Sequence, residues 1–230
     1  WGEVSAFYIQ GHGSSTGKLT INNSSFSNNN FSPLNQQGSS SLSVIYSRSP
    51  KLHISNVLFE SHDCFDPDYQ YVINTVNDND LDSLVFNNVK ILNNNCGGIR
   101  IYGGVAMNNI KVLIENSLIA NNLGRGILIQ NYDATLNHVT IAENSDPGGT
   151  TSHSQFCFEH QYGSGEISII NSILSSTSLN VFSDYQIYSS YSNNSTINIF
   201  NSNISNLSSL GFSGSTLNLQ NNIDSEFLFL

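Results

Sequence analysis

LTINNSSF, at Leu19–Phe26, is the first of eight copies of one short pattern in this chain. A copy contains two apolar residues two positions apart and an asparagine two positions later; in seven copies an apolar residue follows three positions after the asparagine. The other copies are LHISNVLF (Leu52–Phe59), LVFNNVKI (Leu84–Ile91), VLIENSLI (Val112–Ile119), ATLNHVTI (Ala134–Ile141), ISIINSIL (Ile167–Leu174), INIFNSNI (Ile197–Ile204) and LNLQNNID (Leu217–Asp224). Successive asparagines, with His138 as the one substitution, are 20 to 33 residues apart. A short sequence motif that recurs at variable spacing is typical of a solenoid whose coils carry loops of different length.

The apolar positions of this repeat predict strands that face one interior. We number each copy from its asparagine, position 0. Positions −4 and −2, such as Leu19 and Ile21, alternate with more polar residues, which is the period of a half-buried strand. Position +3, such as Phe26, faces the same core. Asparagine tolerates the left-handed backbone of a tight corner, so position 0 is where the chain should bend. Stacked asparagines are also expected to form a ladder of amide hydrogen bonds.

A second series of apolar strands lies between the copies. Its members are AFYI from Ala6, SVIY from Ser43, YVIN from Tyr71, GIRIY from Gly98, GILIQ from Gly126, FCFEH from Phe156 and YQIY from Tyr185. No window shows apolar residues at helical spacing over the length of an ordinary helix. The sequence therefore predicts an all-β fold, a parallel β-helix of about eight coils with neighbouring coils about 4.8 Å apart.

Several longer stretches resemble a known class of repeat. NSLIANNLGRGILIQN (Asn116–Asn131), NHVTIAENS (Asn137–Ser145) and NNIDSEFLF (Asn221–Phe229) look like the right-handed, pectate-lyase-like β-helix repeats of large secreted bacterial surface proteins. The last stretch is similar to the "NID…PLF" phrase that often closes such arrays, with Phe227 in place of the proline. The resemblance covers almost the whole chain and implies a scaffold and an extracellular location, secreted or attached to the cell surface. It does not imply an activity.

Composition limits the classes of partner. Asn and Ser make up 34 and 38 of the 230 residues, and the net charge is −10 with seven Lys and Arg. Nucleic acids and anionic membranes are bound through clustered Lys and Arg, so neither is expected as a partner. No apolar run is long enough to span a membrane. We expect one domain over residues 1–230; because the chain lacks an initiator Met and ends on an apolar run, we interpret it as a segment of a longer protein.

Two cysteines occupy the same position of consecutive copies. Cys64 and Cys96 each follow the repeat asparagine by eight residues, so stacked coils should bring them within the Cα separation of about 4.4–6.8 Å that a disulfide accepts. A disulfide and a pair of buried thiols are both compatible with this spacing, and an oxidising compartment favours the disulfide. Cys157 is expected to be unpaired.

One acidic run suggests a cation site. Asp78, Asp80 and Asp82 alternate in DNDLD, a spacing that can direct several oxygens towards one calcium ion. The run is not an EF-hand, because it lacks the glycine and the final glutamate of that loop. The alternative is a solvated loop whose aspartates supply turn chemistry, and in that case the chain has no cofactor.

The pectate-lyase-like resemblance also suggests a catalytic alternative. Such enzymes use carboxylates or calcium with an Arg or Lys on an outward strand face. The corresponding outward residues here would be Arg100, Glu159, His160 and Tyr188, with Glu159 and His160 as an acid/base pair. The sequence does not show that these residues converge, and for each of them a solvated position on a regular strand is the favoured alternative.

Aromatic residues suggest a binding face. Tyrosines recur in or beside the second series of strands, and a row of aromatic faces with amides between them suits a neutral sugar chain or a protein surface. The candidate binding residues are Tyr102, Gln130, Tyr132 and Tyr188. Aromatic capping of the core at coil corners is the alternative for each tyrosine.

Two functions follow from these observations. The preferred one is an extracellular, non-catalytic β-helix module, a structural spacer or adhesive segment of a surface or filament protein that contacts a glycan or surface protein along one face. Open coil ends would also allow self-association. The alternative is a polysaccharide lyase, hydrolase or epimerase on the same scaffold.

Overall fold

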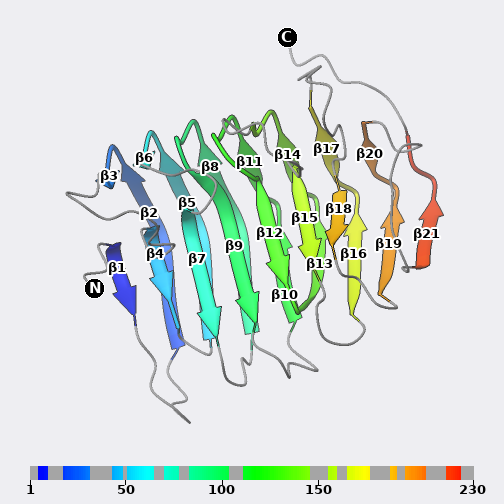
Figure 1. The fold of residues 1–230 in the computed structure, drawn as a ribbon, viewed down its shortest axis with the longest axis horizontal. Helices are drawn as coiled ribbons and strands as arrows, with labels where there is room; N and C mark the ends of the chain where they lie inside the picture. The colour runs from blue at the N-terminus through cyan, green and yellow to red at the C-terminus, as the bar shows by residue number, and fades with distance from the viewer. Residues whose placement is uncertain are drawn as a thin grey trace.

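The structure is a computed structural model. It describes residues 5–9, 18–31, 43–48, 51–64, 70–77, 83–103, 111–145, 155–159, 165–176, 187–190, 195–205 and 216–223. In these residues the chain is a parallel β-solenoid without a helix, which confirms the predicted fold class. Figure 1 shows the strands side by side, in order from the N-terminal to the C-terminal end.

Two large sheets form the faces of the solenoid. Sheet A contains one strand of the second series per coil: β1 (Ser5–Ile9), β4 (Ser43–Ser47), β7 (Tyr71–Asn77), β9 (Gly97–Gly103), β12 (Ile127–Gln130), β15 (Phe156–Glu159) and β18 (Ile187–Ser190). The first row of sheet B contains the eight repeat copies: β2 (Lys18–Ser27), β5 (Lys51–Glu60), β8 (Ser83–Leu92), β10 (Lys111–Glu115), β13 (Asp133–Asn137), β16 (Glu166–Ile170), β19 (Thr196–Phe200) and β21 (Thr216–Gln220).

Short strands continue the coils after the repeat asparagine. The second row of sheet B contains β11 (Leu118–Ala120), β14 (Thr140–Ala142), β17 (Ile173–Ser175) and β20 (Asn203–Ile204), which stack on the ends of the longer strands β2, β5 and β8. A small third sheet pairs β3 (Asn30–Phe31) with β6 (Asp63–Cys64). The described residues form fewer complete turns than the expected eight coils, because sheet A has seven strands and β21 follows β19 and β20 without a described sheet A strand between them.

The interior is a set of apolar columns, one for each predicted apolar position. At position −2 the column contains Ile54, Phe86, Ile114, Leu136, Ile169 and Ile199, all fully buried. Position +3 contains Phe59, Ile91, Ile119, Ile141, Leu174 and Ile204, also fully buried. Each side chain stacks on its equivalent in the next coil, so the alternation that predicted half-buried strands is confirmed.

Each coil has a tight corner at position 0. All eight residues there have positive φ, between 51° and 56°, including the substituted His138. Left-handed backbone is costly for most residues and least costly for glycine and asparagine, so the repeat asparagine is explained by the backbone. The predicted side-chain ladder is present only in parts: Asn88 Nδ2 donates to Asn56 Oδ1 over 2.9 Å, and Asn221 Nδ2 donates to Asn201 Oδ1 over 3.1 Å. We call these position-0 residues the corner residues.

A second corner follows at position +5, where Asn28, Ser61, Asn93, Asn121 and Glu143 also have positive φ. The next residue, at position +6, points inward. Asn94, Asn122 and Asn144 are buried there and form a continuous ladder that ends on Gln155. We call Asn94, Asn122, Asn144 and Gln155, with His62 in the preceding coil, the buried ladder.

Each ladder amide makes several hydrogen bonds. Asn122 Oδ1 accepts from both the backbone N–H and the Nδ2 of Asn94, at 3.2 and 2.7 Å. Its Nδ2 donates to the Ile91 carbonyl over 3.0 Å and to Asn144 Oδ1 over 2.8 Å. The ladder therefore satisfies backbone groups that the second corner would otherwise leave unpaired in the interior.

His62 occupies the ladder position of an earlier coil. Its backbone N–H donates to Asn94 Oδ1, and its Nδ1 lies 3.2 Å from the backbone nitrogen of Asn29, which donates to it. The residue is 1% exposed. Burial lowers the pKa of His62 to about 4, and a hydrogen bond with the Phe26 backbone acts in the opposite direction.

Cys64 and Cys96 form a disulfide between neighbouring coils, with their Cα atoms 5.3 Å apart. This is one of the two alternatives that the sequence left open. Cys157, in sheet A, is buried and forms no disulfide with another described residue.

Candidate functional site

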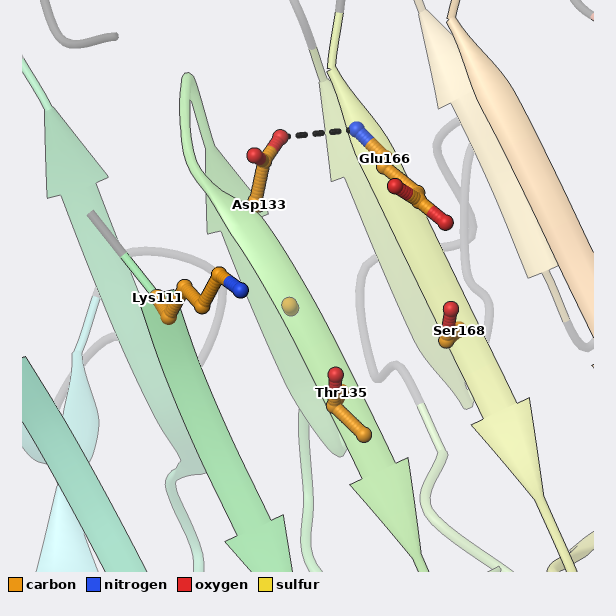
Figure 2. A pocket seen from close by; sticks show the side chains of 6 residues that line it. Lys111, Asp133, Thr135, Glu166 and Ser168 are labelled. Carbon is orange, nitrogen blue, oxygen red and sulfur yellow. Dashed lines mark hydrogen bonds between the residues drawn. The ribbon is translucent and has the colours of Figure 1, made fainter. Parts of the chain in front are cut away.

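A shallow depression lies on the outward side of sheet B, over β10, β13 and β16. It has a volume of about 160 Å³ and is lined by Lys111, Asp133, Ala134, Thr135, Glu166 and Ser168. Figure 2 shows these side chains on three neighbouring strands, with Lys111 directed towards β13. Because these strands are stacked in register within one sheet, their outward side chains are held on a rigid support.

The repeat explains which residues reach this surface. Lys111, Asp133 and Glu166 occupy position −5 of three consecutive copies, and Thr135 and Ser168 occupy position −3. These positions alternate with the inward positions −4 and −2, so their side chains point outward. One ammonium group, two carboxylates and two hydroxyls are thus collected at one place.

The two carboxylates have defined partners. Asp133 Oδ1 accepts a hydrogen bond of 2.7 Å from the backbone N–H of Glu166, as the dashed line in Figure 2 marks. Glu166 Oε1 accepts one of 2.7 Å from Asn198 Nδ2 on the next strand. Each carboxylate keeps a second oxygen that can accept a hydrogen bond from a ligand. Lys111 is exposed and makes no ion pair within the described residues, and its ammonium group has three N–H donors.

The structure separates the residues of the catalytic alternative. Arg100 is aligned with Leu128, Leu128 with Cys157, and Cys157 with Tyr188. The backbones of Arg100 and Tyr188 are therefore three strand spacings apart, about 14 Å. Glu159 is aligned with Gln130, two residues further along the strands than the aligned pair Leu128 and Cys157. His160 lies outside the described residues. At the level of the backbone these residues do not converge on one point.

Two tyrosines of sheet A lie close to arginine side chains: Tyr102, a candidate binding residue, and Tyr71. The guanidinium of Arg100 lies 5.5 Å from the ring centroid of Tyr102, and Arg125 Nη1 lies 3.5 Å from the Tyr71 hydroxyl. Tyr71 is almost fully buried; burial raises its pKa, and the positive charge of Arg125 acts against this rise. No group of the described residues is hydrogen-bonded to the Nε of Arg100, which is buried.

Two members of the predicted binding row are inside the protein. Tyr132 is fully buried in the main core, where its ring occupies the space beside Gly103; a Cβ at that glycine would lie 2.7 Å from the ring. Gln130 is 8% exposed. This burial favours the alternative for Tyr132, packing of the aromatic ring in the core, and the assignment of both residues to a ligand-binding row stays a prediction. The backbone of Tyr188 lies in β18, and the structure leaves its role in binding a prediction.

The predicted calcium residues Asp78, Asp80 and Asp82 lie outside the described residues, so the cation site stays a prediction. In the part of the chain that the structure describes, no group of three or more His, Cys, Asp or Glu side chains is placed to hold a metal ion. The same residues contain no helix of the length and hydropathy needed to cross a bilayer.

Comparison with known proteins gives no family for this chain. No protein family, curated protein or solved structure matches it. The candidate site therefore has to be interpreted from its own residues.

Proposed function

We propose that this chain is an extracellular, non-catalytic β-helix module, a spacer or adhesive segment that binds a neutral glycan in the depression over β10, β13 and β16. The observation that carries the proposal is the composition of that depression. Its carboxylate oxygens accept hydrogen bonds from sugar hydroxyls, while Lys111, Thr135 and Ser168 donate them. Hydrogen-bonding groups of both kinds on a rigid surface suit a polyhydroxylated ligand.

Charge favours a neutral ligand over an anionic one. Two carboxylates and one ammonium group leave the depression with an excess of negative charge, and the whole chain has a net charge of −10. Both would repel an anionic polysaccharide. A depression of this size binds about one sugar unit weakly, with a Kd of roughly 1 mM for about a dozen ligand atoms. Adhesion would then depend on several modules acting together.

The disulfide supports the extracellular location. Disulfides such as Cys64–Cys96 persist in oxidising compartments and are rare in the reducing cytosol. The resemblance to repeats of secreted surface proteins agrees with this compartment, and a regular stack of coils is suited to hold a binding face away from its anchor.

The test is binding of neutral mono- and oligosaccharides, measured on a multivalent glycan array and by NMR titration. The double variant D133N/E166Q removes both negative charges, but each new amide oxygen can still accept the hydrogen bond seen in the structure. We expect binding to weaken at least about tenfold, by the loss of charge-assisted hydrogen bonds. E115Q is the matched control, since Glu115 lies on β10 outside the depression. Equal binding by wild type and D133N/E166Q would contradict the proposal.

Glycoside hydrolysis is a second candidate, favoured by one observation. Asp133 and Glu166 are carboxylates on neighbouring strands of the same depression, and glycosidases use a pair of carboxylates. Incubation of the bound glycans with the protein, followed by product analysis, separates the two functions. Release of reducing sugar that D133N and E166Q each abolish would establish the hydrolase and overturn the non-catalytic proposal.

A further inference from the structure

The interior of the solenoid is open at β21, the last described strand in the first row of sheet B. Leu219 on β21 stands at the end of the position −2 column and is 48% exposed, whereas Ile199 directly beneath it is fully buried. The remaining members of that column, from Ile54 onward, are fully buried as well. Leu219 is therefore the exposed member of a column whose members from Ile54 to Ile199 are covered by the next coil.

The backbone is open at the same place. Among the described residues β21 pairs only with β19, so its other edge has no strand partner. The first row of sheet B begins in the same way: in the part of the chain that the structure describes, β2 pairs only with β5, and its inward residues Leu19 and Ile21 are partly buried. An open strand edge beside an exposed apolar column is a template for another strand of the same pattern.

We propose that a second copy of this chain stacks head to tail on the first, with its β2 adding as a parallel strand to β21. The contact would repeat the coil-to-coil packing that the chain already contains between each pair of neighbouring rungs. Ile21 of the second copy would cover Leu219, and Leu19 would cover Leu217, as equivalent residues do throughout the sheet. This inference does not depend on glycan binding.

The corner residues would continue across the same contact. Asn221 Nδ2 donates to Asn201 Oδ1 in the preceding rung, and Asn88 donates to Asn56 in the same direction. Asn23 of the added copy would donate to Asn221 in the same way. Because this contact joins different ends of the two copies, it does not close on itself and leads to linear assemblies.

The first experiment measures the sedimentation coefficient of the full chain over a wide range of concentrations. We expect it to rise with concentration in wild type. L219K places a charge at the centre of the contact and should weaken association roughly 10- to 100-fold, the effect of losing one buried apolar side chain and adding a charge. Q220K adds the same charge on the neighbouring outward position and should associate like wild type. A monomer at every concentration, including the case in which residues 224–230 cover the end, would overturn the proposal.

A second experiment tests the register, and it does not depend on the stability of L219K. Thr20 and Asn218 occupy the same outward position in β2 and β21. Head-to-tail stacking would place their Cα atoms about 4.8 Å apart, within the range for a disulfide. A mixture of T20C and N218C should therefore form a crosslinked heterodimer under mild oxidation. N218C crosslinking to itself, as tail-to-tail pairing would produce, or no crosslink at all would contradict the inference.

Discussion

The corner residues and the buried ladder use asparagine for different reasons. Asn116 is an exposed corner residue with φ of 51°, and its Nδ2 donates to the side chain of Asn87. Asn122, six residues later, is 1% exposed, and its side chain bonds to two backbone groups and two neighbouring amides. The first asparagine is required by the backbone conformation and the second by its hydrogen-bonding capacity. The repetition of a residue in a sequence therefore does not tell where its stabilisation is largest.

The largest expected effect is the loss of a ladder amide. Asn122→Ala removes the acceptor of the Asn94 backbone N–H and the donor to the Ile91 carbonyl, and leaves both groups buried without a partner. At about 1–3 kcal/mol for each unsatisfied group, unfolding should become easier by about 3–5 kcal/mol. The measurement is the free energy of unfolding in urea.

Asn95→Ala is the matched control for that change. Asn95 is exposed and follows ladder residue Asn94 directly, and its Nδ2 donates to Asp63 Oδ1 over 3.0 Å. Its loss should change stability by less than about 1 kcal/mol, because an exposed donor and acceptor return to water. Equal effects of Asn122→Ala and Asn95→Ala would remove the distinction between buried and exposed amides.

A smaller effect is expected from acid, which acts on the histidine of the buried ladder. Since the pKa of folded His62 is lowered to about 4 from 6.5, the stabilisation due to the neutral ring is complete above pH 6.5 and is lost as the pH falls towards 4. The loss should reach roughly 2–3 kcal/mol. The difference in unfolding free energy between wild type and His62→Asn, measured from pH 7 to pH 4, isolates this contribution. A difference that does not vary with pH would contradict it.

Corner residues should be less sensitive than the buried ladder. Asn116→Ala places a Cβ in left-handed backbone without the asparagine side chain, at a cost of about 1–2 kcal/mol. Asn116→Gly keeps the backbone conformation accessible and should stay within about 0.5 kcal/mol of wild type. Thermal unfolding of the two variants gives the comparison. If alanine and glycine were equivalent, backbone conformation would not be the reason for asparagine at the corner.

The smallest expected effect is at the one irregular corner. His138 has φ of 56° and is exposed, so its side chain contributes little beyond tolerating this conformation. His138→Asn should stabilise the protein by a few tenths of a kcal/mol, because asparagine adopts left-handed backbone more readily. The melting temperature should rise slightly, and a fall would show that the imidazole has a role of its own.

The fold could be predicted from the sequence because its rules are local. Period-two alternation and a recurring asparagine placed the strands and the first corner of each coil, and the structure confirms both. The second corner and the buried ladder were missed, although doublets such as Asn121–Asn122 contained a signal for them. Two adjacent asparagines have opposite exposure there, and composition alone does not distinguish which of them points inward.

The candidate site was harder to predict, because it depends on register across strands. Lys111, Asp133 and Glu166 come from three copies, and only the stacking of the coils brings them together. Their shared position −5 was visible in the sequence and could have suggested the site. Tyr132 was expected in an outward binding row, but its ring is buried against Gly103 of the neighbouring coil, a match in shape that one strand does not reveal.

The disulfide also determines how the molecule would resist a pulling force. In a stack of coils each rung is held mainly by its neighbours, so tension applied at one end peels rungs off one after another. The bond between Cys64 and Cys96 joins two coils covalently, so tension along the chain passes through this bond and does not extend the residues between the two cysteines. Under shear at a surface, peeling from the N-terminal side would therefore release no extended chain between these two cysteines, and the molecule would lengthen less at this pair of coils than at coils without a covalent link.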